Sequence, residues 1–422
     1  HAPRRFGWDC YGLPVENEIE KAQNLSGAPE IEKFGVAKFN EECRSIVLRY
    51  TQEWKTTVAR MGRWVDFDKT WHTMDKSFME SVWWVFGELF KKGLVYEGLK
   101  VMPFSAKLGT PISNFEANLN YREVDDPSLI VAFPLRDEPD VSLVAWTTTP
   151  WTLPSNLALA VHPELDYVKI KDETGRILIL AEARVAANFK EYTVLEKMKG
   201  KALKGLQYNP PFKYFFNEWD AKAFRVLTDE FVTIEDGTGV VHMAPAFGEA
   251  DFFICQREGI DPVCPVDQNG KFTAEVPDYQ GMYVKDADKE IIKRLKAENK
   301  VIYHGTIHHR YPFCWRSDTP LIYKAVRTWF VAVEKIKDRM VKANEQIHWV
   351  PDHIKDGRFG KWLEQARDWA ISRNRYWGTP IPLWRSEDGE LKAIGSVKEL
   401  EELTGKEIVD LHRHFIDDLT FT

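Results

Sequence analysis

The spacing of apolar residues changes twice along this chain, and this change constrains the fold more than any other feature of the sequence. At 36–61 and at 74–90, apolar residues recur every three or four positions, which predicts two long amphipathic helices. Between about 121 and 305, short apolar runs alternate with Gly, Pro and Asp, a pattern typical of short strands joined by turns. The sequence therefore predicts an α/β protein that is interrupted by an inserted β-rich domain with a few helices.

The boundaries of the elements follow from the same pattern. Within the insertion, short strands are expected at 143–147, 157–161, 167–171, 176–180, 224–227 and 240–243. Helices are expected there at 182–190, 249–258 and 285–298. Before the insertion we expect a loop at 64–68 and a strand at 94–102. The inserted domain is therefore predicted at 121–310, between the flanking parts 1–120 and 311–422.

Composition and charge exclude several classes of protein. No run of residues approaches the roughly 18 apolar positions of a membrane span, so no membrane-spanning segment is expected. The net charge of −7 argues against a protein that coats nucleic acid indiscriminately, although a local basic surface would still suffice for tRNA. The five cysteines are scattered without a Cys-x-x-Cys pair, so neither a disulfide framework nor a zinc site is indicated. Reduced thiols in a cytoplasmic protein without a metal site are the expectation.

The segment 146–156 carries an unusual density of hydroxyl groups. It has the sequence Trp-Thr-Thr-Thr-Pro-Trp-Thr-Leu-Pro-Ser-Asn and follows the apolar run 143–145, which predicts a buried strand. Pro150 ends that strand, and Pro154 is expected to prevent regular structure after it. Each hydroxyl is one donor and up to two acceptors, which suits a ribose, an ester or a phosphate oxygen. The alternative is a Thr-rich strand end followed by two prolines in a turn, because β-branched residues are common in strands.

Several motifs carry a resemblance to a known family. The segment 146–156 resembles the threonine-rich segment in the editing domain of isoleucyl-tRNA synthetases; leucyl and valyl relatives have Arg where this chain has Thr149. The run Gly-Thr-Gly-Val-Val-His-Met-Ala-Pro at 237–245, followed by Asp251, is similar to a second segment of that domain. The segment 7–16, with Tyr11 in place of the usual His, resembles one that lines the aminoacylation pocket. The run 78–86 resembles eukaryotic-type versions.

The resemblance implies a fold and a limit on activity. It implies a Rossmann-like catalytic domain interrupted by an editing domain that is β-barrel-like. Residues 311–322 and 367–382 are similar to the family's return path into the catalytic fold. The family's His-Ile-Gly-His and Lys-Met-Ser-Lys-Ser signatures, which bind ATP, are absent from this sequence. The chain is thus expected not to form aminoacyl-adenylate, to need no cofactor for editing, and to belong to a longer enzyme that uses ATP and Mg.

The resemblance also assigns roles to single residues. Asp251 is expected to hold the α-ammonium of the substrate, since a carboxylate gives charge-assisted hydrogen bonds. Its alternative is a carboxylate in the first turn of a helix, which the helix dipole favours. Catalytic roles are predicted for Asp251, Thr148 and His242, although a histidine on a strand is often only structural. Substrate contacts are predicted for Thr147, Thr149, Trp151, Thr152 and Asn156.

The predicted function is post-transfer editing, which here means hydrolysis of the ester of valine mischarged on tRNA(Ile). The predicted partners are the 3′ acceptor end of tRNA(Ile), valine and isoleucine, with a multi-synthetase assembly possible for the full-length form. One alternative is a non-catalytic module that binds the tRNA acceptor and is active only within the full-length enzyme. A generic esterase is disfavoured, because the chain has no Gly-x-Ser-x-Gly motif.

Two charged stretches have open interpretations. The first stretch contains Lys197, Lys199, Lys201 and Lys204. A run of charges more often forms a solvated surface, and contact with phosphate is the alternative. The second stretch contains Arg373, Arg375, Tyr376 and Trp377. It places cations beside aromatic residues, which suits stacking or contact with nucleic acid.

Overall fold

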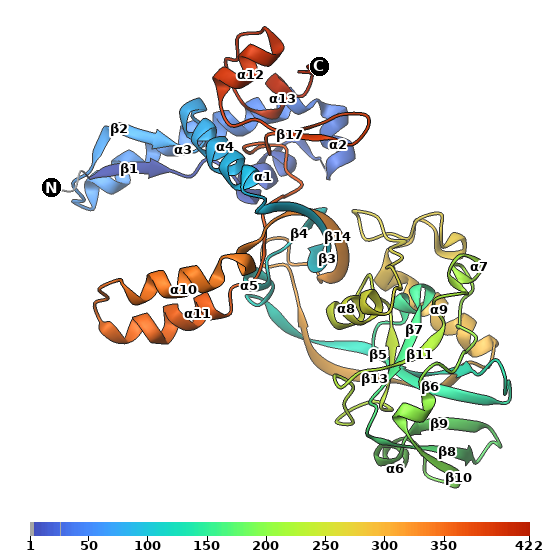
Figure 1. Ribbon diagram of the computed structural model, residues 1–422. Coiled ribbons are helices and arrows are strands. Elements are labelled where there is room, and N and C mark those ends of the chain that lie inside the picture. Colours follow the sequence, from blue (N-terminus) through green and yellow to red (C-terminus); the bar gives the residue numbers. More distant parts are fainter. Residues whose placement is uncertain (1–3, 26) are drawn as a thin grey trace. The chain divides into compact units, whose positions relative to one another are not determined.

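The computed structural model describes residues 4–25 and 27–422, and this chain forms two compact units (Figure 1). The first unit consists of the described residues up to Gly98 together with Arg327–Thr422, and the second unit is Leu99–Val326. The chain therefore leaves the first unit, forms the second and returns. The predicted β-rich domain at 121–310 lies wholly within the second unit, which also contains the strand ends that flank it.

The second unit is built around one large β-sheet. Among the described residues this sheet has nine strands, in the order β10-β8-β9-β6-β12-β7-β11, with β5 paired to β6 and β13 paired to β5. The strands are β5 (Tyr121–Pro134), β6 (Val141–Thr147), β7 (Ala158–Val161), β8 (Asp166–Asp172), β9 (Ile177–Ala181), β10 (Tyr192–Lys199), β11 (Arg225–Thr228), β12 (Val240–Met243) and β13 (Val301–Pro312). Every strand predicted inside the insertion is confirmed to within two residues at each end.

The sheet buries apolar side chains on both faces. Leu129, Val131 and Phe133 of β5 belong to one hydrophobic cluster, whereas Ile130 between them belongs to another. Successive side chains of a strand point to opposite faces, so β5 contributes to two cores at once. This explains why β7, β9 and the second half of β5 are continuous apolar runs and do not alternate with polar residues.

Short helices complete the second unit. They are α5 (Asn114–Ala117), α6 (Val185–Asn188), α7 (Phe216–Trp219), α8 (Glu249–Arg257) and α9 (Val284–Ala297), and a short strand β4 (Thr110–Pro111) precedes them. The helices predicted at 249–258 and 285–298 are confirmed as α8 and α9. The helix predicted at 182–190 is instead a 3₁₀ turn, Glu182–Arg184, followed by one turn of α-helix.

The first unit contains the long helices that the sequence predicts. Its elements before the second unit are β1 (Arg5–Trp8), α1 (Leu13–Gln23), α2 (Ala28–Phe34), α3 (Val36–Arg60), β2 (Asp66–His72) and α4 (Lys76–Lys91). Those after it are α10 (Lys337–Glu345), α11 (Gly360–Glu364), β15 (Trp369–Ala370), β16 (Leu383–Arg385), β17 (Leu391–Ala393), α12 (Val397–Thr404) and α13 (Arg413–Ile416). The observed mixture of helices and sheets confirms the predicted α/β class. None of the described helices is long and apolar enough to cross a membrane.

The loop predicted at 64–68 is wrong from Asp66 onward. Asp66, Phe67 and Asp68 lie in β2, which pairs in parallel with β1. The rings of Phe6 and Phe67 lie 5.3 Å apart across this pair. The charged residues of the segment predict a loop locally, but pairing with a strand about sixty positions away determines its structure.

Two strands carry the chain between the units. The strand predicted at 94–102 is one continuous strand, β3 (Val95–Ser105), and the chain returns through β14 (Ile322–Val331). The unit boundaries fall inside these strands, after Gly98 and after Val326.

Candidate functional site

The two motifs that resemble the family's editing domain lie at one edge of the large sheet. Strands β6 and β12 are parallel and pair at Trp146 and Val241. Because parallel strands end at the same edge, Thr147 at the end of β6 lies close to His242 of β12. Segments that are about ninety positions apart in the sequence therefore meet in the second unit.

The segment after β6 is a short helix, which corrects one expectation. Residues Pro150–Ser155 form a 3₁₀ helix, η1, although Pro154 was expected to prevent regular structure. Pro150 suits the first position of this helix because its missing N–H would have no intrahelical partner there. The N–H of Thr152 donates to the carbonyl of Thr149 at 3.0 Å, and that of Asn156 donates to the carbonyl of Leu153 at 3.1 Å.

Asn156 ties η1 to the core of the sheet. Its Oδ1 accepts a hydrogen bond from the Tyr208 hydroxyl at 2.7 Å. Its Nδ2 donates to the carbonyl of Ala158 at 3.0 Å and to Nδ1 of His242 at 2.8 Å. Burial raises the pKa of Tyr208 well above its ordinary value, so this hydroxyl stays a donor. The amide of Asn156 is thus fixed in one orientation by its partners.

His242 is held at both ring nitrogens. Since Nδ1 accepts from Asn156, the proton of the neutral ring lies on Nε2, which donates to Oγ1 of Thr152 at 3.0 Å. The Thr152 hydroxyl in turn donates to the carbonyl of Thr149 at 2.8 Å. Burial lowers the pKa of His242 to about 3, so the ring is neutral near neutral pH. This geometry favours a structural role for His242 over proton transfer.

The three consecutive threonines differ in what they bind. Oγ1 of Thr147 accepts from the N–H of Thr149 at 3.1 Å, a local turn that fixes the backbone after β6. Oγ1 of Thr149 lies 3.4 Å from Oγ1 of Thr147 and 3.4 Å from Oγ1 of Thr152. Thr148 is half-buried, and no described residue hydrogen-bonds its hydroxyl. Of these hydroxyls, that of Thr148 is the one left for a bound molecule.

Asp251 lies in the first turn of α8, on the segment that follows β12. Its Oδ2 accepts a hydrogen bond from the N–H of Ala244 at 2.9 Å. The carboxylate lies over Gly248, where a Cβ atom would approach its Cγ to 2.6 Å. Burial raises the pKa of Asp251 to about 6, against the effect of the Ala244 hydrogen bond. The carboxylate is therefore charged at neutral pH, near a helix N-terminus that favours an anion.

Trp151 is part of the core that joins these two segments. Its side chain is 2% exposed, and its ring packs edge-to-face on Phe247 with the ring centres 4.8 Å apart. Phe247 immediately precedes Gly248, so this contact links η1 to the segment of Asp251. The Trp151 Nε1–H has no hydrogen-bond partner within the part of the chain that the structure describes.

Sequence reasoning missed Asp288. Its Oδ1 accepts a hydrogen bond from the backbone N–H of Trp151 at 2.8 Å, and the residue is 8% exposed. A signal for it was present in the sequence of α9. Asp288 occupies a position on the buried side of this helix, whose other members are Val284, Ala287, Ile291, Ile292 and Leu295. A carboxylate at such a position indicates a specific buried partner.

The two charged stretches with open interpretations have internal partners. Lys197 lies 2.6 Å from Glu182, and Lys199 lies 2.8 Å from Asp166. In the first unit, Trp377 is 1% exposed and stacks on the ring of His412 at 4.4 Å. Trp377 is therefore a core residue in this structure, and its ring offers no free face for base stacking.

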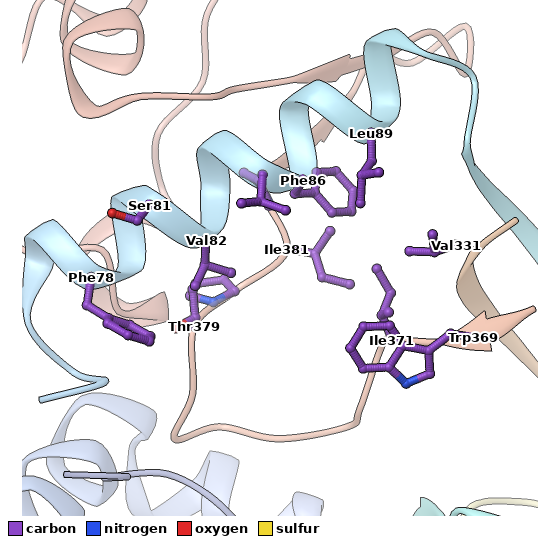
Figure 2. A pocket seen from close by; sticks show the side chains of 13 residues that line it. Phe78, Ser81, Val82, Phe86, Leu89, Val331, Trp369, Ile371, Thr379 and Ile381 are labelled. Carbon is purple, nitrogen blue, oxygen red and sulfur yellow. The ribbon is translucent and has the colours of Figure 1, made fainter. Parts of the chain in front are cut away.

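The first unit contains a cavity with a mainly apolar lining. Figure 2 shows it beside α4. Its volume is about 450 Å³. Phe78, Val82, Phe86 and Leu89 line it from α4, with Trp369 opposite. Its hydroxyls come from Ser81 and Thr379, and Ser81 donates to the carbonyl of Ser77 on its own helix at 2.9 Å. This lining contains no charged residue and does not suit a phosphate.

Within 4–25 and 27–422, no cluster of three or more His, Cys, Asp or Glu could hold a metal ion.

Comparison with known proteins decides the family. The model of the tRNA synthetases of class I (I, L, M and V) matches residues 1–421. The chain belongs to this family. It is 66% identical to the isoleucine–tRNA ligase of Protochlamydia amoebophila (strain UWE25), over 100% of this chain and 41% of that protein. It is 62% identical to that of Chlamydia pneumoniae, over 99% and 40% respectively. The chain thus spans about two fifths of the length of the curated relatives it matches.

Two solved structures are similar to part of the chain. The crystal structure of GlLeuRS-CP1 matches 42% of this chain and 99% of its own, with 15% identity and a TM-score of 0.34. The editing domain of the P. knowlesi cytosolic leucyl-tRNA synthetase matches 43% and 96%, with 12% identity and a TM-score of 0.31. Scores this low carry no information about the site.

Proposed function

We propose that this chain is part of an isoleucyl-tRNA synthetase and that its second unit hydrolyses valine from mischarged tRNA(Ile). The observation that carries the proposal is the meeting of the threonine-rich segment with the strand that leads to Asp251. Membership of the family supports it, as does the 62–66% identity to proteins named isoleucine–tRNA ligase.

Asp251 binds the α-ammonium group of the aminoacyl ester. With a pKa of about 6, the carboxylate is ionised at neutral pH and offers a charge-assisted hydrogen bond. A bound ammonium favours the ionised form further, since an opposite charge nearby lowers the pKa of a carboxyl. The N–H of Ala244 holds one oxygen and leaves the other for the substrate.

The threonine-rich segment orients the ester and the attacking water. The free hydroxyl of Thr148 contacts the ribose or the water, while Thr147, Thr149, Thr152 and Asn156 fix the shape of the pocket through their hydrogen bonds. His242 holds Thr152 and Asn156 in place and transfers no proton in the reaction. Catalysis then rests on positioning and on donors for the developing oxyanion.

A hydrolytic site of this kind has a physical purpose. One methylene in an apolar pocket contributes only about 1–3 kcal/mol, a general figure for which the choice between isoleucine and valine by isoleucyl-tRNA synthetases is itself the standard example. An isoleucine site therefore cannot strongly reject valine. A second pocket that accepts valine and excludes isoleucine removes the resulting error.

The remaining expectations concern the longer protein. ATP and Mg are needed there to form the aminoacyl-adenylate, and editing itself needs neither. The partners are the 3′ end of tRNA(Ile), valine and isoleucine, in the cytoplasm, with a multi-synthetase assembly in the full-length form. The similarity of 78–86 to eukaryotic-type versions stays a prediction, and the relatives named above are chlamydial.

The test is the release of valine from Val-tRNA(Ile) by this chain, with Ile-tRNA(Ile) measured alongside. We expect cleavage of the valyl ester and not of the isoleucyl ester, with loss of cleavage in Asp251→Ala. Asp261→Ala, at an exposed position just beyond α8, is the matched control. Unchanged cleavage in Asp251→Ala would contradict the proposal. Binding of tRNA without any cleavage would instead support the non-catalytic acceptor-binding module.

A further inference from the structure

Asp288 is a carboxylate at a position where the rest of α9 is apolar. It is 8% exposed, and its neighbours on the buried side of the helix are apolar residues such as Ala287 and Ile291. Burying a carboxylate costs free energy unless a hydrogen bond or an opposite charge compensates it. An apolar residue would fill this position without that cost, so the carboxylate is expected to have a specific partner.

The partner is the backbone of the threonine-rich segment. Oδ1 of Asp288 accepts the N–H of Trp151 at 2.8 Å, across 137 positions of sequence. Pro150 has no N–H, so that of Trp151 is the first donor of η1, and no carbonyl of the helix can accept it. Without Asp288 this N–H would be buried and unpaired.

Trp151 is also the point where the two halves of the candidate site meet. On one side its ring packs on Phe247, next to Gly248 and the segment of Asp251. On the other side the following residue, Thr152, is bonded to His242 at 3.0 Å. One hydrogen bond from α9 therefore fixes the start of η1 relative to both halves.

We propose that Asp288 is a positioning residue for ester hydrolysis, which holds η1 at Trp151 so that the threonine hydroxyls and Asp251 face one substrate. This inference rests on the proposed function. Asp288 touches no substrate itself and acts through the backbone of Trp151.

The charges around Asp288 are compatible with this role. Lys285 of α9 lies 3.2 Å from Asp126 of β5, and Asp126 lies 3.0 Å from Nε2 of His309 on β13. The ring of Tyr311, also on β13, lies 4.0 Å from Nζ of Lys285. Burial raises the pKa of Asp288 to about 7, against the hydrogen bond from Trp151 and the charge of Lys285; Asp126 and Asp286 act in the same direction as burial. Both protonation states keep an oxygen that accepts the Trp151 N–H, and the anion binds it more strongly.

The test compares three substitutions of Asp288. Asn keeps an oxygen acceptor without charge, Ala removes the acceptor, and Leu removes the acceptor while keeping the branch at Cγ, with two methyl groups in place of the two oxygens. Asp286→Ala is the control, because Asp286 lies on the same helix and is exposed. The measurements are kcat and KM for valine release from Val-tRNA(Ile), and amide hydrogen exchange of the peptide 147–156.

We expect Asp288→Ala and Asp288→Leu to lower kcat by about tenfold to a hundredfold, with KM changed by less than about threefold, and to accelerate exchange of this peptide by at least about tenfold. Asp288→Asn and Asp286→Ala should stay close to the unsubstituted chain in both measurements. If Asp288→Ala fails to fold, Asp288→Leu decides, because it leaves no cavity.

Two outcomes would overturn the inference. One is unchanged exchange of 147–156 in Asp288→Leu. The other is an Asp288→Asn variant as impaired in kcat as Asp288→Leu, which would mean that the acceptor is not the feature that matters. Failure of the proposed function is separate: the unsubstituted chain would then release no valine, and the exchange measurement would still decide whether Asp288 holds η1.

Discussion

The two halves of the candidate site are stabilised in different ways. The threonine-rich half is a network of neutral groups, in which Asn156, His242 and Thr152 are joined by hydrogen bonds of 2.8 and 3.0 Å. The other half contains one charged group, Asp251, whose carboxylate accepts the N–H of Ala244 and lies over Gly248. The first half resembles the interior of a stable domain, and the second maintains a partly buried charge at a cost.

The neutral network therefore determines the shape of the site, and Asp251 supplies its charge. Loss of a member of the neutral network leaves a buried donor or acceptor unpaired, so it should reduce stability first and activity second. Loss of the charge should abolish activity and leave stability unchanged or improved. Substitutions in either half can therefore test whether the two roles are separate.

The largest effect is expected for Asp251→Asn. The substitution removes the charge while keeping the shape, so valine release should fall by about a hundredfold to a thousandfold. Burial raises the pKa of Asp251 from its ordinary value to about 6, so the native state opposes ionisation. The variant should therefore melt at a higher temperature than the unsubstituted chain at pH 8, and this difference should vanish at pH 4. A lower melting temperature at pH 8 would contradict the view that the charge of Asp251 serves activity and not stability.

Gly248→Ala should move the same carboxylate without removing it. The new Cβ would lie 2.6 Å from Cγ of Asp251, so the carboxylate must shift from its position at Ala244. We expect valine release to fall by about tenfold to a hundredfold. Gly378→Ala is the control, because a Cβ added there would meet nothing within 4 Å and the φ of Gly378 is not positive. Equal activity of the two variants would show that the position of the carboxylate is not critical.

Thr152→Val tests the neutral half. Valine has nearly the same shape, but it leaves Nε2–H of His242 without its acceptor, at a cost of about 1–3 kcal/mol in the free energy of unfolding. Activity should fall by less than in the Asp251 variants. Thr193→Val on the exposed strand β10 is the control and should change stability little. Urea denaturation of both variants measures the difference, and equal midpoints would argue against the importance of the network.

The pH dependence of stability should come from the carboxylates. Burial raises the pKa values of Asp251 and Asp288 to about 6 and about 7, so the folded state binds more protons than the unfolded state between roughly pH 4 and 7. Their contribution to stability is complete below the unfolded pKa and is lost as pH rises through 6 and 7. The double variant Asp251→Asn, Asp288→Asn should flatten this fall in urea melts at pH 4–8. A fall of the same size in the double variant would exclude these groups as its cause.

The smallest effect is expected for Lys197→Ala. Lys197 lies 2.6 Å from Glu182 at the surface, and exposed ion pairs contribute little to stability. Valine release and KM for Val-tRNA(Ile) should both stay within about twofold. A large rise of KM would instead indicate that this lysine contacts the phosphates of the tRNA.

The sequence predicted the insertion and most of its strands because apolar spacing is a local signal. It also predicted that the segments of Thr152 and His242 belong to one site, although this came from resemblance and not from spacing. Local signals failed where contact with a residue distant in the sequence determines the structure. The strand that contains Phe67 forms because β1 pairs with it, and Asp288 is explained only by its contact with Trp151.

Some side chains have surroundings that no pattern in one sequence reveals. Trp151 was predicted to contact substrate, but its side chain packs in the core against Phe247. Trp377 was considered for stacking with bases, and His412 covers its ring. In both cases the residue type suits either role, and only the three-dimensional packing distinguishes them.

The close approach at Gly248 also limits how this gene can change. A glycine codon has G in its first two positions, and every single-base change that alters the amino acid produces a residue with a Cβ atom or a stop codon. Each such residue would meet the carboxylate of Asp251 at a distance that real Cβ atoms do not reach. We therefore expect every amino-acid change that one base substitution can produce at this codon to displace the carboxylate of Asp251.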